Sequence, residues 1–462
     1  MISLLLLIIL SCSVFAENVW AEGFTYEFEE PAHCKSLFMV SMDTGKVVYE
    51  KNPDEQLPIA SLTKIMTYIV AYENIPDIEN TRITVGNSVA EILAATGSSL
   101  SGVQTGETFT GLQLLNLMMI PSGNDAALTL CQYVDTIKGA KLTDSFEKQS
   151  TNMVGSAFVK LMNDKAQELG CSNTHFTNPH GLHNPEHYST ARDMATIARY
   201  ATTLPYFTEI TGSENYTLPP TNKSSEERTV YTTNRMFSQY EDDGSYYYSK
   251  TKGIKTGSLD EAGYCIAASA QSEGYSYIVI ALGSPMITAQ GETIEEHGEM
   301  LDAATLFEWA FTGIENKTIA TKGDLLGDIK LQYAWNKDHL QLVAEDNVQA
   351  LLPVDVSISS VIVSVDLPEK VQAPVKKGDI IGTASFSYAE ESIAKINIVA
   401  AESVERSELV QTVEVGKEVI TSPVFLVIAG IIVVILALYF TSIFVYNHKK
   451  KKMRRVKKYR NL

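Results

Sequence analysis

Residues 59–74 read IASLTKIMTYIVAYEN, and this stretch decides the fold. Its apolar residues recur at the three- and four-residue spacing of an amphipathic helix, which buries one stripe in a core. Ser61 and Lys64 are three positions apart, so on such a helix their side chains lie one turn apart on one face, which Tyr68 shares. The core-facing stripe is predicted to contain Leu62, Ile65, Met66, Ile69 and Val70.

The pair Ser61 and Lys64 has the chemistry of an activated nucleophile. A serine hydroxyl is a weak nucleophile until a base takes its proton, and a lysine amine can do so when burial or other cations lower its pKa. Free backbone N–H groups at a helix start would also stabilise an oxyanion. Alone the pattern is weak, because a surface lysine one turn from a capping serine is much commoner.

A second short motif, Ser122-Gly123-Asn124, follows Pro121 on a loop between two predicted helices. A serine and an asparagine in such a loop can relay a proton and hold a substrate amide. By itself the motif is equally typical of a turn that caps the following helix.

A third motif, Lys255-Thr256-Gly257, opens a predicted strand. A lysine and a threonine hydroxyl suit a carboxylate, and a glycine lets a substrate backbone approach closely. The three motifs in this order, S-x-x-K, S-x-N and K-T-G, are typical of the serine penicillin-recognising enzymes.

With these motifs the chain resembles the D-alanyl-D-alanine carboxypeptidases, the low-molecular-mass penicillin-binding proteins. The resemblance extends to MDTGKVVYEKNPDEQLPIASLTKIMT, MMIPSGNDAA, NPHGLHNPEHYSTARDMATIAR and GIKTGSLDEAGYCIAASA. It implies an α/β (α+β) catalytic domain of the β-lactamase/transpeptidase type over residues 22–312. A small all-β domain is expected over 313–404, where short strand-like runs alternate with Gly, Asp and Lys turns.

The resemblance also implies a role for each motif residue. Ser61 would attack the penultimate D-Ala carbonyl of a peptidoglycan stem peptide, with Lys64 as general base. Ser122, with Lys255 as a further candidate, would pass a proton to the leaving amine, and β-lactams would acylate Ser61. No cofactor and no metal are expected.

Substrate binding would fall to the remaining residues. Asn124 would hold the peptide backbone, Lys255 and Thr256 the terminal carboxylate, and Gly257 would let the peptide approach. The N–H groups of Ser61 and Ser258 would form the oxyanion hole.

Two positions depart from the family pattern. Ser258-Leu259 stand where relatives often have a larger polar or aromatic residue and Thr. Many relatives also place an arginine after the strand equivalent to YSYIVIALG, whereas the segment SPMITAQGETIEEH that follows it here has no Lys or Arg. Carboxylate binding is therefore expected to depend more on Lys255 and Thr256.

Other functions remain compatible with the motifs. A β-lactamase shares them, and a DD-endopeptidase or transpeptidase differs only in substrate or acyl acceptor. The alternative that is not primarily an enzyme is a catalytically weak cell-wall-binding protein.

The two ends of the chain predict export and anchoring. Residues 1–21 resemble a signal peptide cut after Ala16 or Ala21, although Cys12 also permits a lipoprotein interpretation. Val424–Tyr446 is an uncharged apolar run of about 23 residues, enough to span a bilayer. The tail 447–462 carries nine Lys or Arg and no acid, which predicts a cytoplasmic tail and a single-pass protein with its catalytic domain outside. The net charge of −18 excludes a nucleic-acid binder.

One stretch resembles a metal-binding motif instead. Residues 183–187, HNPEH, match the H-x-x-E-H spacing of a class of zinc peptidases. Pro185 would break the helix that this ligand spacing needs, so the stretch is predicted to be a loop. We expect His180 and His187 to organise that loop through hydrogen bonds, with Thr190 or Ser189 capping the next helix.

Overall fold

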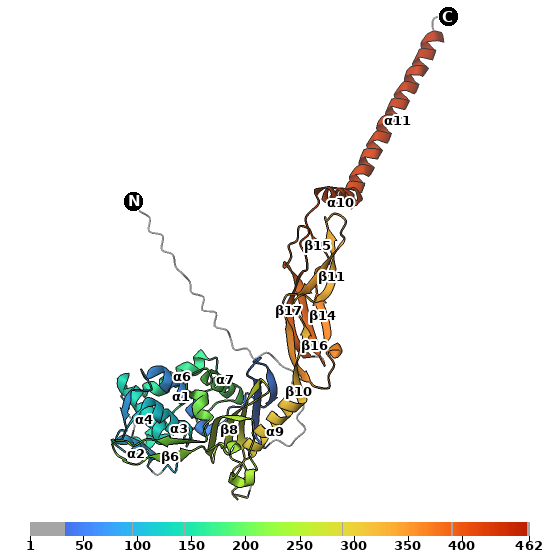
Figure 1. Cartoon of the computed structure of the whole chain (residues 1–462). Helices are drawn as coiled ribbons and strands as arrows, with labels where there is room; N and C mark the ends of the chain where they lie inside the picture. Colours follow the sequence, from blue (N-terminus) through green and yellow to red (C-terminus); the bar gives the residue numbers. More distant parts are fainter. Residues whose placement is uncertain (1–32, 95, 142–144, 289, 390, 460–462) are drawn as a thin grey trace, which may run out of the picture. The chain divides into compact units, whose positions relative to one another are not determined.

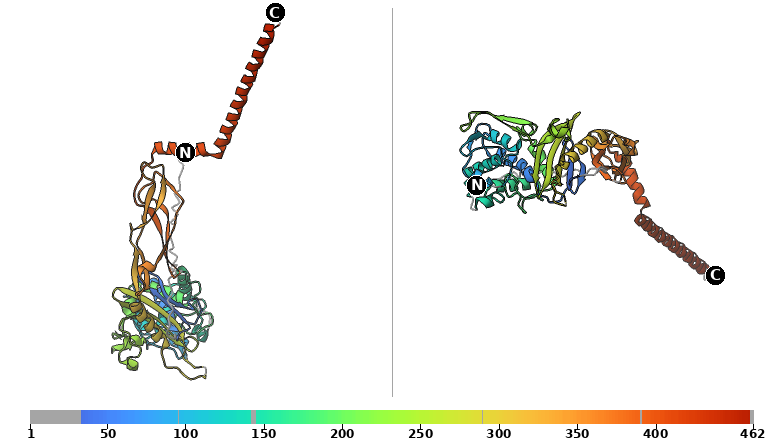
Figure 2. Two further views of the ribbon diagram at one scale, coloured as in Figure 1. Left: turned by 90° about the vertical axis from the view of Figure 1, so that its right-hand side faces the viewer. Right: turned by 90° about the horizontal axis from the view of Figure 1, so that it is seen from below.

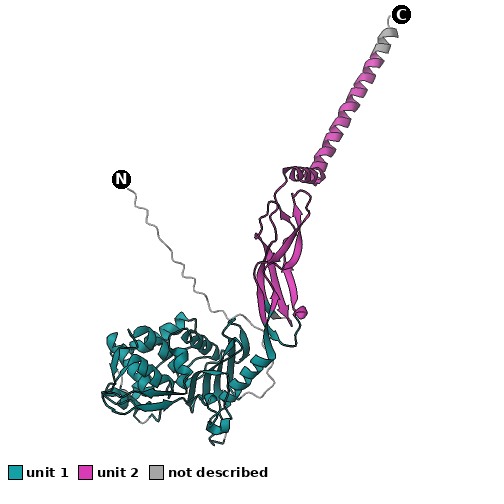
Figure 3. Cartoon of the chain, viewed as in Figure 1, with its two compact units in different colours: residues 1–317, 351–357, 389–393 teal, residues 318–350, 358–388, 394–462 magenta. Residues whose placement is uncertain are grey.

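The computed structural model describes residues 33–94, 96–141, 145–288, 290–389 and 391–459. The predicted signal peptide, 1–21, lies outside these residues. The chain forms two compact units (Figure 3). The first contains the chain to Lys317 with Leu351–Ser357 and Ala389–Ile393, and the second contains Thr318–Ala350, Ile358–Tyr388 and the chain from Ala394. The domain boundaries expected from the sequence stay a prediction.

The first unit is built on a five-stranded antiparallel sheet in the order β2-β1-β9-β8-β7 (Figure 1). The strands β1 and β2 form an antiparallel hairpin around Thr44-Gly45. The strands are β1 (Ser36–Ser41), β2 (Val47–Lys51), β7 (Thr251–Leu259), β8 (Gly263–Ser272) and β9 (Tyr275–Ser284).

Both faces of this sheet are covered, which explains the almost continuous apolar sequence of β9. Alternate side chains point to opposite faces. Ile278 and Ile280 therefore join the core with the helical part of the unit, and Val279 joins a second core with α9 (Gly298–Gly313). In Figures 1 and 2, α9 and the helical part lie on opposite sides of the sheet.

The helical part contains the predicted helix after Ser61, the two around the second motif and the one after Thr190, together with α6. The helix α1 (Thr63–Asn74) is buried from Thr63 to Ala71. The others are α3 (Gly111–Met119), α4 (Asn124–Ile137), α6 (Ala157–Glu168) and α7 (Ala191–Ala201). Shorter elements complete the unit: α2 (Ser88–Leu93), α5 (Phe146–Gln149), α8 (Phe207–Thr211), and the strand pairs β3 (Arg82–Thr84) with β4 (Thr108–Thr110) and β5 (Asn215–Leu218) with β6 (Arg228–Tyr231).

Beyond α9 the chain is rich in strands, as the sequence predicted. A six-stranded sheet has the order β14-β16-β17-β12-β11-β15, and β10 pairs with β13. The strands are β10 (Ile314–Ala320), β11 (Leu325–Gln332), β12 (His339–Ala344), β13 (Val348–Pro353), β14 (Ile362–Asp366), β15 (Val371–Gln372), β16 (Ile380–Tyr388) and β17 (Glu391–Ala400).

Two helices end the chain. The helix α10 covers Glu408–Thr421, and α11 runs over Pro423–Tyr459. Among the described residues, Pro423–Lys451 is the one helical segment long and apolar enough to cross a membrane. It includes the predicted span, Val424–Tyr446.

Candidate active site

The nucleophile motif lies where the chain enters α1. Ser61 is on a 3-10 turn, Ala60–Leu62, rather than in the first turn of the α-helix. Ala60 has φ of 44°, in the left-handed region, so regular helix geometry begins only at Thr63. Despite this, Ser61 Oγ lies 2.8 Å from Lys64 Nζ, as the three-residue spacing predicted.

The amine of Lys64 is fully buried and surrounded by oxygen atoms. It donates to Asn124 Oδ1 at 2.6 Å and to the His180 carbonyl oxygen at 3.0 Å, and it lies 3.4 Å from Ser122 Oγ. Burial, and then the charge of Lys255, hold the pKa of Lys64 well below its usual value. A neutral amine has two hydrogens and one lone pair. With both hydrogens engaged by Asn124 and His180, the lone pair can accept the Ser61 proton.

The second motif is held in a tight loop before α4. Ser122 has φ of 62°, an unusual conformation for serine, and is 4% exposed. A side chain at position 123 would lie 2.6 Å from the Leu117 carbonyl oxygen, so only glycine fits. Asn124 begins α4 with its backbone N–H bonded to the Ser99 carbonyl oxygen. The next residue, Asp125, accepts from the N–H groups of a neighbouring loop: Ser101, Gly102 and Val103.

The third motif lies within β7 rather than at its start, because the strand begins at Thr251. Lys255 is 1% exposed, and burial lowers its pKa to about 7. Its amine donates to the Thr256 carbonyl oxygen at 3.1 Å and lies 3.5 Å from Thr233 Oγ1. A Cβ on Gly257 would lie 3.0 Å from the Ser61 nitrogen, so glycine lets β7 pass directly against the nucleophile turn.

These residues meet at one cavity of about 190 Å³. Six of the eight residues predicted from the motifs line it, and Lys64 and Lys255 are buried behind it. The six are Ser61, Ser122, Asn124, Thr256, Gly257 and Ser258. Other residues that line it were not predicted as site residues: Thr96, Gly97, Ser98, Ser99, Gly181, Leu182, Thr233 and Leu259. Leu259 was marked only as a departure from the family pattern. The others have small or neutral side chains that the motifs do not mark, so only the tertiary structure brings them to the cavity.

The HNPEH stretch is a loop, as predicted, and His187 organises it. Both ring nitrogens of His187 are engaged, Nε2 with Thr63 Oγ1 at 2.8 Å and Nδ1 with the Thr177 N–H at 3.1 Å. Burial lowers the pKa of His187 to about 3, so the ring is neutral. Thr190 caps α7 by accepting from the Asp193 N–H, which confirms one of the two predicted caps.

His180 lies at the cavity itself. Its carbonyl oxygen accepts from Lys64, its Nδ1 accepts from the Leu182 N–H at 3.4 Å, and the residue lines the cavity. Burial holds the pKa of His180 well below its usual value. His180 therefore connects the loop to Lys64 as well as organising the loop.

Comparison with known proteins gives the same family over most of the chain. Residues 25–286 match the D-alanyl-D-alanine carboxypeptidase family, and residues 315–406 match the C-terminal domain of penicillin-binding protein 5. The D-alanyl-D-alanine carboxypeptidase DacF of Bacillus subtilis is 29% identical over 406 residues, which cover 87% of this chain and 94% of the relative. The D-alanyl-D-alanine carboxypeptidase of Streptomyces sp. (strain K15) is 30% identical over 55% of this chain and 81% of its own length.

Solved structures show the same fold. The D-alanyl-D-alanine carboxypeptidase DacD from Francisella tularensis superposes with a TM-score of 0.62 at 24% identity, covering 84% of this chain and 96% of that one. Penicillin-binding protein 5 from Haemophilus influenzae has a TM-score of 0.58 at 24% identity, covering 82% and 100%. Since the family match spans more than half of its length, the chain belongs to the D-alanyl-D-alanine carboxypeptidase family.

Proposed function

We propose that this chain is a serine-type D-alanyl-D-alanine carboxypeptidase that removes the terminal D-Ala from peptidoglycan stem pentapeptides. The observation that carries the proposal is the buried amine of Lys64, 2.8 Å from Ser61 Oγ and bonded to Asn124 of the second motif. A base in direct contact with a nucleophile at the wall of a cavity is the arrangement that acyl transfer needs.

In the acylation step, Ser61 Oγ attacks the carbonyl carbon of the penultimate D-Ala and its proton moves to Lys64 Nζ. The N–H groups of Ser61 and Ser258 stabilise the oxyanion, since β7 passes against the Ser61 nitrogen. The bond from the carbonyl carbon to nitrogen then breaks. Ser122, 3.4 Å from Lys64 Nζ, passes the proton to the leaving amine, and D-Ala departs.

In the deacylation step, water attacks the carbonyl carbon of the Ser61 ester and a proton of the water passes through Lys64 to Ser61 Oγ. The bond from the carbonyl carbon to Oγ breaks, and the shortened peptide leaves with a free carboxylate. The Asn124 amide holds the peptide backbone in both steps, while Lys255 and Thr256 hold the terminal carboxylate until D-Ala leaves. The β-lactams are covalent inhibitors in this scheme, because opening their ring amide esterifies Ser61.

The chain is also proposed to be a single-pass membrane protein, with the catalytic unit on the extracytoplasmic side and the basic tail in the cytoplasm. The apolar segment Pro423–Lys451 and the lysines and arginines that follow Val424–Tyr446 support this topology.

The test of the function is release of free D-Ala from a pentapeptide ending in D-Ala-D-Ala by the full-length protein in detergent. We expect release by the wild type and none by Ser61→Ala. Equal release by both proteins, or none by either, would contradict the proposal. Two parallel assays separate the related functions: release from cross-linked dimers would indicate a DD-endopeptidase, and subsecond decay of a penicillin adduct would indicate a β-lactamase.

A further inference from the structure

The cavity at Ser61 is lined by two groups of residues from different parts of the chain. One group, the loop side, contains residues 96–99 with Ser122 and Asn124. The other group, the strand side, contains Thr233 and residues 256–259. In the proposed mechanism, Asn124 holds the peptide backbone from the loop side and Thr256 holds the carboxylate from the strand side. One substrate can reach both only if the two sides keep a fixed spacing, because even a small misplacement of a binding group is costly.

The loop side is fixed to the start of α4 by a buried carboxylate. Asp125 is 4% exposed and accepts from the N–H groups of Ser101, Gly102 and Val103 at 2.8, 3.0 and 3.2 Å. The N–H of Asn124 donates to the carbonyl oxygen of Ser99 at 2.9 Å. Residues 99–103 are therefore held to the same helix that carries Asn124.

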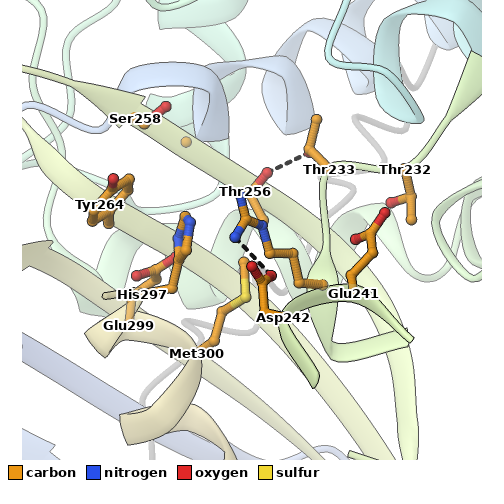
Figure 4. Close-up of a pocket in the computed structure, with 12 residues that line it drawn as sticks. Thr232, Thr233, Glu241, Asp242, Thr256, Ser258, Tyr264, His297, Glu299 and Met300 are labelled. Carbon is orange, nitrogen blue, oxygen red and sulfur yellow. Dashed lines mark hydrogen bonds and ion pairs between the residues drawn. The ribbon is translucent and has the colours of Figure 1, made fainter. Parts of the chain in front are cut away.

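The strand side is connected to the β5–β6 hairpin. Just after β6 ends at Tyr231, Thr233 Oγ1 lies 2.5 Å from Thr256 Oγ1, the contact drawn as a dashed line in Figure 4. The N–H of Thr232 donates to the carbonyl oxygen of Glu214, directly before β5. The position of the hairpin therefore determines where Thr233 meets β7.

One arginine joins this hairpin to the loop side. Arg228, the first residue of β6, donates from Nη1 to the Gly102 carbonyl oxygen at 2.9 Å and from Nη2 to Glu107 Oε1 at 2.6 Å. The Glu107 side chain is 0% exposed. Its carboxylate also accepts from the Gln104 N–H at 2.9 Å and from Thr221 Oγ1, in the hairpin connection, at 2.5 Å. The planar guanidinium thus reaches two acceptors at once, which a lysine amine on a single stem does less well.

We propose that Arg228, held by the buried carboxylate of Glu107, fixes the spacing between the loop side and the strand side of the cavity. Arg228 is a positioning residue, because it acts through Gly102 and the hairpin and lies outside the residues that line the cavity. The inference rests on the proposed function, because the spacing matters for the substrate that both sides hold. A pair with a fully buried carboxylate is suited to this task, since leaving that charge unpaired is costly.

The hairpin is the part that moves when this connection is lost. Among the residues of β5 and β6, all of which the structure describes, only Leu218 is buried. The helix α4, in contrast, is buried along most of its length. Loss of the arginine therefore shifts Thr233 and the strand side, while Lys64 keeps its contact with Asn124.

The experiment uses the full-length protein in detergent and two reactions at Ser61: D-Ala release from an acylated D-Ala-D-Ala peptide, and acylation by benzylpenicillin. Arg228→Lys keeps a charge beside Glu107 without the planar fork. The double variant Glu107→Gln/Arg228→Gln removes the pair and leaves no buried charge unpaired. Thermal unfolding identifies an assay temperature at which every variant is folded.

Arg192→Gln is the matched control. The Arg192 side chain is 28% exposed, as is that of Arg228, and it pairs with Glu50 and Asp54. Arg192 and its two partners are outside the residues that line the cavity.

For the peptide we expect the double variant to raise KM about 10- to 100-fold with kcat changed less, because a binding group is displaced while Ser61 and Lys64 stay in place. Arg228→Lys should raise KM by a smaller factor. The acidic limb of the pH profile should stay where it is in the wild type, because the surroundings of Lys64 are kept. Arg192→Gln should leave KM and kcat unchanged.

A fall in kcat with an unchanged KM, the sign of a smaller folded fraction, would show a purely structural role and overturn the proposal. Wild-type kinetics in the folded double variant, or an equal rise of KM in Arg192→Gln, would also overturn it. The two hypotheses fail separately. A wild type that releases no D-Ala contradicts the proposed function, while the binding constant and rate constant of penicillin acylation still decide the role of Arg228.

Discussion

The amine of Lys64 lies 2.6 Å from Oδ1 of Asn124, and this contact joins the first motif to the second. The two residues come from helices that begin 61 positions apart, α1 at Thr63 and α4 at Asn124. The amide oxygen is neutral, so it accepts a hydrogen without favouring the charged form of the amine as a carboxylate would. The protonation state of Lys64 therefore depends on the side chain at position 124.

Asn124→Asp should shift the pH dependence of the enzyme to higher pH. A carboxylate in contact with Lys64 raises the pKa of the amine, and only the neutral amine accepts the Ser61 proton. We expect kcat/KM to fall about 10- to 100-fold at pH 7 and to recover partly as the pH rises. The measurement is the pH profile of D-Ala release, with Asn80→Asp, at an exposed asparagine, as control. An unshifted acidic limb would contradict this role.

Lys255→Met should stabilise the protein while removing carboxylate binding. The pKa of Lys255 is about 7 when folded and about 10.4 when unfolded, so the unfolded chain binds the proton more tightly. The resulting destabilisation is complete below pH 7 and disappears as the pH rises through the unfolded value. We expect a gain of about 2–4 kcal/mol in the free energy of unfolding at pH 6 that declines towards pH 10. Denaturant titrations at several pH values measure it, and a loss of stability at pH 6 would contradict it.

His187→Ala should destabilise the protein without any involvement of metal. The variant leaves the buried Thr177 N–H without the His187 ring, at a cost of about 1–3 kcal/mol. It also removes one of the two hydrogen bonds of the Thr63 hydroxyl, which keeps its bond to the Ala60 carbonyl oxygen. In the wild type, His187 also reduces stability as the pH falls from about 6.5 towards 3, because the unfolded chain takes up the proton first. Thermal unfolding of both proteins checks this. Activity of the wild type should be unchanged in a chelator, and a loss that zinc restores would revive the metal interpretation.

The full-length protein should stay with the membrane in alkaline carbonate. The apolar segment Pro423–Lys451 is long enough to span the bilayer, and such a span resists extraction that releases surface-bound proteins. A chain that ends at Thr421 keeps the amphipathic α10 but lacks the span, and we expect carbonate to release it. Release of the full-length protein would show that α11 lies on the surface or does not anchor the chain.

Much of the site could be predicted because its chemistry is local. Ser61 and Lys64 are one turn apart in a strongly periodic stretch, and glycines at 123 and 257 mark places where a side chain has no room. The order of the three motifs then predicts that they meet, although no single motif shows it.

The rest depends on contacts between distant parts of the chain. Thr233 has an ordinary sequence context and enters the site only because its hydroxyl meets Thr256. Arg228 precedes it in the same segment, and nothing in its neighbours indicates that it pairs with the buried Glu107. The 3-10 turn at Ser61 likewise comes from the left-handed backbone of Ala60, which the helical period does not predict.

The most direct test of the account is to locate the covalent adduct formed with benzylpenicillin. The protein is treated with the antibiotic, digested and mapped by mass spectrometry. The account predicts one penicilloyl group, on Ser61, with no adduct on Ser61→Ala. An adduct on another residue, or none on a folded wild-type protein, would contradict the claim that Ser61 is the nucleophile.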